Sequence, residues 1–121
     1  MFHILVADDD KNPRRLMQAV LEGDGYTVTT ACDGEEALAV MDREHIDLVV
    51  LDIMMPNMDG YAAARAIRAM PDDRAGLPII AMTANAFEED KQRAFEAGMN
   101  DHIAKPISVD TLLATLRKNM K

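Results

Sequence analysis

The order of apolar and polar residues along the chain predicts five short strands that alternate with five amphipathic helices. The strands are short runs rich in aliphatic residues and lie at residues 2–7, 27–31, 47–51, 77–82 and 101–104. Apolar residues at helical spacing predict the helices at residues 12–23, 34–44, 59–70, 86–97 and 108–119. In the first helix we expect Leu16, Val20 and Leu21 on one buried face, and in the last we expect Ser108 to be the cap. Regular alternation of strand and helix is typical of an α/β fold with a parallel sheet.

Right-handed crossovers leave few arrangements for five parallel strands, and the order 2-1-3-4-5 is the favoured one. We therefore predict a flavodoxin-like (βα)5 three-layer sandwich whose parallel five-stranded sheet has helices on both faces. Residues 1–121 are expected to form one domain, because a chain of this length buries about two-thirds of the surface that it exposes when unfolded.

Acidic residues follow two of the predicted strands where each strand ends. Asp8 and Asp9 come directly after the first strand, and Asp52 comes directly after the third. In the order 2-1-3-4-5 these strands are neighbours, so the three carboxylates should share the crevice at their carboxyl ends. Crowded carboxylates either raise one another's pKa or recruit a hard divalent cation, and Mg²⁺ is the natural partner. Asp10 is expected only to cap the first helix, and Asp59 with the glycine after it only to begin the third helix.

The composition limits the cellular environments and the binding partners that we expect for this chain. A net charge of −8 argues against a surface that binds nucleic acid or an anionic membrane. Cys32 is the single cysteine, which excludes an internal disulfide and fits a reducing compartment. The amino terminus lacks a basic leader, and the apolar runs are too short to span a bilayer. We expect a cytoplasmic protein with no direct contact with nucleic acid and no membrane insertion.

Four short motifs appear in order, each at or after the end of a predicted strand. They are ILVADDD ending at Asp10, LVVLDIMMPNMDG around Asp52, MTAN beginning at Met82, and the pair Lys105-Pro106. Each motif is weak alone, but together they form a specific signature. On these residues the chain resembles a bacterial response-regulator receiver domain of two-component signalling over essentially its whole length. The stretch TANAFEEDKQRAFEAGMNDHIAKPI looks like receivers of hybrid sensor kinases.

The resemblance implies a phosphoryl acceptor and a metal site. It implies that Asp52 accepts a phosphoryl group, that Asp9 and Asp52 bind Mg²⁺ with the help of Asp8, and that the backbone carbonyl of Met54 is a further ligand. These roles agree with elementary chemistry. A carboxylate can attack phosphorus as a nucleophile, and a divalent ion offsets the negative charge of both reacting groups.

Two further residues are implied to engage the phosphoryl oxygens. Thr83 offers a hydroxyl donor and Lys105 a positive charge. We expect Lys105 to pair with the phosphoryl group only once that group is present, and therefore to matter more for the response than for the chemistry. His102 lies three residues before Lys105, where many receivers carry Tyr or Phe as a switch residue. Whether histidine acts as the switch stays open.

The implied partners are a phosphohistidine donor and a protein target. The donor would be a sensor histidine kinase or a histidine phosphotransfer domain. The acyl phosphate is expected to act through residues 83–87 on the surface formed by the fourth helix, fifth strand and fifth helix. The chain ends at Lys121, after the last predicted helix, so we expect output by protein contact. A stand-alone regulator and a receiver excised from a longer protein both remain open, and we expect a monomer or a weak phosphorylation-dependent dimer.

Three other interpretations compete with this resemblance. An Mg²⁺-dependent aspartyl-phosphate phosphatase of the haloacid dehalogenase type needs a second acid two residues after the nucleophile, where this chain has Met54. An FMN-binding, flavodoxin-like electron carrier needs a first loop rich in Ser, Thr and Gly, whereas three aspartates from Asp8 to Asp10 would repel the phosphate of FMN. A receiver turned into a purely structural interaction module fits poorly with the complete set of acids, threonine and lysine.

Overall fold

The computed structural model describes residues 2–84 and 88–120 of the chain. Within these residues five strands form one parallel sheet in the order β2-β1-β3-β4-β5. The strands are β1 (His3–Ala7), β2 (Thr27–Ala31), β3 (Leu48–Asp52), β4 (Ile79–Thr83) and β5 (Asp101–Ala104). The predicted strand order and parallel pairing are therefore confirmed.

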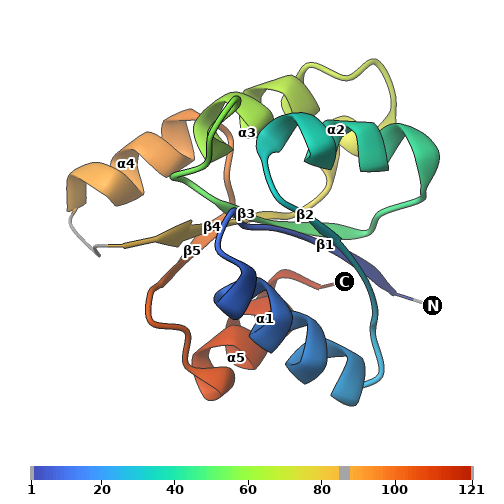
Figure 1. The fold of residues 1–121 in the computed structure, drawn as a ribbon. Helices are drawn as coiled ribbons and strands as arrows, with labels where there is room; N and C mark the ends of the chain where they lie inside the picture. Colours follow the sequence, from blue (N-terminus) through green and yellow to red (C-terminus); the bar gives the residue numbers. More distant parts are fainter. Residues whose placement is uncertain (1, 85–87, 121) are drawn as a thin grey trace.

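The helices cover both faces of the sheet, which gives the three layers expected of a flavodoxin-like fold. Figure 1 shows α1 and α5 on one face and α2, α3 and α4 on the other. Their bounds are α1 (Lys11–Gly23), α2 (Gly34–Arg43), α3 (Gly60–Arg68), α4 (Glu88–Glu96) and α5 (Val109–Asn119). A short 3-10 turn, η1 (Asp73–Gly76), follows α3 and was not predicted.

Side-chain caps fix where four of the helices begin. In each, an oxygen of the preceding residue accepts a hydrogen bond from a backbone N–H in the first turn; these residues are Asp10, Asp33, Asp59 and Ser108. The roles expected for Asp10, Asp59 and Ser108 are confirmed. Such caps satisfy backbone donors that have no partner inside the helix.

The inner strands β1, β3 and β4 are buried on both faces because helices cover both sides of the sheet, whereas the edge strands β2 and β5 are partly exposed. Alternate residues of β1 point to opposite layers: Ile4 and Val6 pack with the side chains of α1 and α5, whereas Leu5 and Ala7 pack with those of α2 and α3. This explains why the inner strands appear in the sequence as nearly continuous apolar runs.

One detail of the predicted core is wrong. The buried face of α1 is formed by Met17 and Leu21, whereas Leu16 is 45% exposed. Met17 and Leu21 are four residues apart and share one side of the helix, and a single step along the helix turns Leu16 away from it. In the part of the chain that the structure describes, no helix has the length and apolar character that a membrane span requires.

Candidate functional site at the carboxyl edge of the sheet

Three carboxylates meet where β1 and β3 end side by side. One carboxylate oxygen from each of Asp8, Asp9 and Asp52 lies within 4.8 Å of the other two. Asp8 is fully buried, Asp52 is 3% exposed, and Asp9 is exposed at the mouth of the crevice. The topology predicted this meeting, and the structure confirms that the three side chains share one place.

Backbone donors hold the two buried carboxylates in position. Asp8 Oδ1 accepts a hydrogen bond of 2.9 Å from the N–H of Asp10, and Asp52 Oδ1 accepts one of 3.2 Å from the N–H of Met54. The N–H of Asp8 in turn donates to the carbonyl of Ala31 at the end of β2. Each acid is thus oriented by the turn that follows its own strand.

Lys105 brings a positive charge between the same two carboxylates. Its Nζ lies 2.8 Å from Asp52 Oδ2 and 3.1 Å from Asp8 Oδ2. Lys105 follows β5, and its backbone N–H donates to the carbonyl of Thr83 at 2.7 Å, which joins the ends of β4 and β5. The ammonium therefore compensates part of the negative charge that the fold gathers here.

Burial raises the pKa of Asp52 to about 6, well above its ordinary value. The hydrogen bond from Lys105 acts in the opposite direction, and the neighbouring Asp8 raises the pKa further. Burial alone would lower the pKa of Lys105, but the hydrogen bonds to Asp52 and Asp8 and their charges outweigh it, so that pKa is raised. Asp52 thus changes charge close to neutral pH, whereas Lys105 keeps its proton.

Thr83 ends β4 beside these carboxylates and Lys105, and its hydroxyl is a hydrogen-bond donor that a ligand could use. The residue is 3% exposed, and within the described part of the chain its Oγ1 makes no hydrogen bond. Leaving a buried hydroxyl without a partner costs roughly 1–3 kcal/mol. A ligand oxygen that reached Thr83 would recover that free energy.

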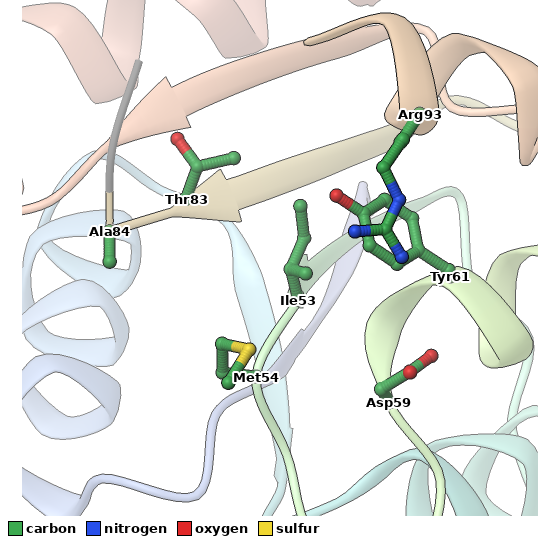
Figure 2. Close-up of a pocket in the computed structure, with 7 residues that line it drawn as sticks. All are labelled: Ile53, Met54, Asp59, Tyr61, Thr83, Ala84 and Arg93. Atoms are coloured by element: carbon green, nitrogen blue, oxygen red, sulfur yellow. The ribbon is translucent and has the colours of Figure 1, made fainter. Parts of the chain in front are cut away.

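A small cavity lies beside the carboxylates, between β4 and the start of α3. It measures about 190 Å³ and its walls are Ile53, Met54, Asp59, Tyr61, Thr83, Ala84 and Arg93 (Figure 2). Met54 is 72% exposed, as expected of a side chain at the mouth of the site. On the far side from Thr83, the guanidinium of Arg93 lies over the ring of Tyr61, 4.6 Å from the ring centroid.

The loop from β3 to α3 is tightly constrained, and two glycines allow this. A Cβ atom on Gly60 would lie 2.5 Å from the carbonyl oxygen of Asp52, so α3 can begin directly against the end of β3 only with glycine there. The same atom on Gly34 would lie 2.5 Å from the carbonyl oxygen of Met58. Asn57 adopts a φ of 65°, and its side-chain amide donates to Asp33 at 2.8 Å. The loop beyond Asp52 is therefore fastened to α2.

The comparisons with known proteins agree with this geometry. The family profile described as the response regulator receiver domain matches residues 4–117. The chain belongs to the receiver-domain family. This receiver is also 45% identical over 113 residues to the sensor histidine kinase RcsC of Escherichia coli strain K12, a match that covers 93% of this chain and 12% of that protein. The family and its place in two-component signalling are thereby shown, whereas the activity of so much longer a relative is not.

Solved receivers have nearly the same structure. The chemotaxis protein CheY4 of Vibrio cholerae superposes with a TM-score of 0.93 at 32% identity, covering 99% of each chain. The receiver domain of a sensor histidine kinase from Pseudomonas aeruginosa gives a TM-score of 0.89 at 36% identity, covering 98% of this chain and 96% of that one. That second structure is described as holding a magnesium ion in its active-site cleft.

The receiver brings together most of the residues predicted for its site. Asp8, Asp9, Asp52 and Lys105 converge, and Thr83 is buried at the neighbouring strand end. The N–H of Met54 bonds to Asp52, so the Met54 backbone lies beside the carboxylate. The chemical role of each of these residues stays a prediction.

The structure changes the energetic role expected of Lys105. Its ammonium is already paired with Asp52 and Asp8, so it does not wait for a phosphoryl group before it finds a partner. The buried crevice makes this pairing favourable, because two unpaired carboxylates there would repel each other. Any phosphoryl contact must replace part of an existing interaction, which leaves Lys105 a smaller differential contribution.

The predicted switch elements are described in part. His102 is on the edge strand β5 with its side chain 26% exposed, and its Nδ1 lies 3.9 Å from Asp101 Oδ1. Its role as a switch stays a prediction. Of the expected switch loop, Thr83 and Ala84 are described, and residues 85–87 lie outside the described residues.

Several structural residues of the site were not singled out from the sequence. Tyr61 and Arg93 are far apart in the chain, and no spacing pattern connects them. Asn57 carried a weak signal, since asparagine tolerates positive φ in a turn better than most residues.

Proposed function

We propose that this receiver is a phosphorylation-dependent switch in which Asp52 takes a phosphoryl group from a phosphohistidine donor with Mg²⁺. The observation that carries the proposal is the convergence of Asp52, Asp8, Asp9 and Lys105 at one edge of the sheet. Family membership supports it. The acyl phosphate would act on a downstream protein through the surface of α4, β5 and α5.

The donor set suits magnesium. Asp8, Asp9 and Asp52 offer only hard carboxylate oxygens, which Mg²⁺ prefers, and the carbonyl of Met54 would be a further oxygen ligand. Asp9 at the exposed mouth leaves room for water molecules in the coordination shell, which Mg²⁺ usually keeps. Bound Mg²⁺ would supply positive charge to the incoming phosphate oxygens. The magnesium ion described in the Pseudomonas aeruginosa receiver supports this assignment.

Asp52, Lys105 and Thr83 would each have a different role in the phosphoryl transfer. An Asp52 oxygen attacks phosphorus, the new O–P bond forms as the P–N bond of phosphohistidine breaks, and the electron pair of that bond returns to the imidazole. With a pKa of about 6, Asp52 is mostly ionised at neutral pH and able to attack. Lys105 would move from the carboxylate to a phosphoryl oxygen, and the unused hydroxyl of Thr83 would donate to another.

The surface next to Lys105 supports docking of a protein donor. Leu16 of α1 is 45% exposed and lies in a groove with Pro13, Pro106 and Ile107, directly beside Lys105. A partner covering this apolar groove would bring its histidine to the rim of the Asp52 crevice. Leu16→Glu should therefore slow transfer from a protein donor while leaving transfer from a small donor unchanged.

Incubation with phosphorylated sensor kinases and phosphotransfer domains tests the proposal. With Mg²⁺, radioactive phosphate should move from the donor to this receiver, and Asp52→Asn should abolish the transfer. Asp110→Asn, which neutralises an exposed carboxylate of α5, is the matched control and should accept phosphate normally. Full transfer to the Asp52→Asn variant would disprove the assignment.

The proposal also includes a cytoplasmic location and a regulatory role in which the receiver catalyses only its own phosphorylation and dephosphorylation. It further includes a monomer or weak phosphorylation-dependent dimer. Membership of the receiver family argues against both the phosphatase and the FMN-binding alternatives.

A further inference from the structure

Helix α4 is anchored by smaller side chains than the other helices. Of the α4 side chains that the structure describes, the buried one is Ala94, and the neighbouring Phe95 is 57% exposed. Each of the other four α-helices in the described ranges buries at least one larger aliphatic side chain or methionine; examples are Met17, Val40, Ile67 and Leu112. Because hydrophobic stabilisation grows with the apolar area buried, α4 is held to the core less strongly than its neighbours.

A contact between α4 and α3 compensates for part of this weaker attachment to the core. Arg93 of α4 places its guanidinium 4.6 Å from the ring centroid of Tyr61, and Tyr61 is a buried residue of α3. A cation over an aromatic face is attracted by the ring quadrupole. This contact links α4 directly to α3, which is the helix that begins against Asp52.

The contact also borders the part of the site where a phosphoryl group would be sensed. Tyr61 and Arg93 form one wall of the cavity whose opposite wall is Thr83, and Ile53, the residue after Asp52, lies between them (Figure 2). A turn of Thr83 towards Asp52 would change the shape of this cavity. The position of Tyr61, and therefore of Arg93, depends on that shape because close-packed walls transmit displacement.

We infer that Arg93 is a positioning residue that holds α4 in its resting place through Tyr61 and so opposes the response to phosphorylation. This inference rests on the proposed function. The contact occurs in the arrangement in which Lys105 is paired with Asp52, so it stabilises that arrangement. A contact shifts an equilibrium only by the difference that it makes between the two states. Displacement of α4 loses the contact, and removing it should favour the displaced state.

The sign of the effect separates this role from simple electrostatics. Arg93 is a positive charge near a site that binds anions, so electrostatics alone predicts that neutralising it weakens anion binding. The positioning role of Arg93 predicts the reverse, namely that neutralising Arg93 strengthens anion binding. If the displaced state is a minor population, any gain in that population raises the apparent affinity for a phosphoryl mimic by the same factor.

The test titrates the protein with beryllofluoride, a tetrahedral phosphoryl mimic, in the presence of Mg²⁺. Binding is followed by the amide NMR signals of α4. Arg93→Gln should bind about two- to fivefold more tightly than the parent, which corresponds to one partly exposed cation–π contact. In the unliganded variant, the α4 signals should lie partway along the line from the free to the beryllofluoride-bound positions.

Conservative variants and a charge control complete the design. Arg93→Lys keeps a cation over the ring and should behave as the parent, whereas Arg117→Gln removes an exposed cation of α5 and should not tighten binding. In a Tyr61→Leu background, Arg93→Gln should give no further gain, because Tyr61→Leu has already removed the contact between the guanidinium and the ring.

The outcomes are distinguishable. If the parent binds no beryllofluoride at all, the proposed function fails before the inference is tested. If the parent binds but Arg93→Gln binds with equal or lower affinity, Arg93 does not restrain the response and the inference is overturned. Equal gains in Arg93→Gln and Arg117→Gln would likewise attribute the effect to net charge and contradict it.

Discussion

Replacing Asp52 with asparagine should stabilise the metal-free protein near neutral pH. The pKa of Asp52 is raised from 3.8 to about 6, so the folded protein holds this proton more tightly than the unfolded chain does. Below both values the carboxyl is neutral in both states and no penalty exists. As pH rises from 3.8 to about 6, the unfolded chain loses the proton first, and the folded state becomes relatively less stable.

The size of the loss in unfolding free energy follows from the pKa shift of Asp52. Two to three kcal/mol is expected at full ionisation, because each pKa unit is worth roughly 1.4 kcal/mol. The same linkage gives a penalty of about 1 kcal/mol at pH 4.5 and about 3 kcal/mol at pH 8. The Asp52→Asn change would leave Lys105 paired with Asp8 at 3.1 Å but would weaken its 2.8 Å contact with the substituted side chain, so part of this gain is offset. We expect a net gain of about 1–3 kcal/mol at pH 8.

Urea unfolding in EDTA measures this directly. The free energy of unfolding of the parent and of Asp52→Asn should be determined at pH 4.5 and at pH 8, and the difference between them should grow with pH. Asp110→Asn should change the unfolding free energy by less than about 0.5 kcal/mol, as is usual for an exposed position. Equal gains at both pH values, or a loss at pH 8, would refute the argument that Asp52 is held in an environment that disfavours its charge.

Three further variants test other parts of the site and fold. Asp9→Ala should weaken Mg²⁺ binding and reduce the rise in thermal stability at a given Mg²⁺ concentration, measured by calorimetry; unchanged affinity would show that the metal site has been assigned to the wrong residues. Lys105→Met should raise the pKa of Asp52 above about 6, measured by carboxyl NMR, because Lys105 lowers it. It should also leave phosphorylation detectable while reducing the α4 response; a full response would show that lysine is not the coupling element. Arg68→Met should lose about 2–4 kcal/mol of unfolding free energy, because its guanidinium donates to three backbone carbonyls and a side-chain amide; a loss under 0.5 kcal/mol would contradict this.

The parts of the fold that could be predicted are those set by local patterns. A strand such as β3 (Leu48–Asp52) is buried on both faces, so its sequence is a continuous apolar run that ends in a polar residue. Crossover rules then leave few strand orders, and the favoured one brings Asp8 and Asp52 together without any knowledge of side-chain packing.

The parts that could not be predicted depend on side chains meeting across the fold. The double pairing of Lys105 arises because the crevice places both acids within reach of one flexible side chain. The stacking of Arg93 on Tyr61 depends on the distance between α3 and α4, which no sequence spacing records. The turn η1 was missed because Asp73 to Gly76 is too short for a helical period to be visible.

The central claim is that Asp52 accepts the phosphoryl group, and the mass of the phosphorylated protein tests it most directly. After incubation with Mg²⁺ and a small acyl-phosphate or phosphoramidate donor, intact-protein mass spectrometry should show a single added phosphoryl group. The bond should be stable in mild acid and labile in base, as an acyl phosphate is, and borohydride reduction followed by peptide mapping should place it on Asp52. Asp52→Asn should remain unmodified under the same conditions. Stoichiometric labelling at any other residue, or labelling of the Asp52→Asn variant, would contradict the account.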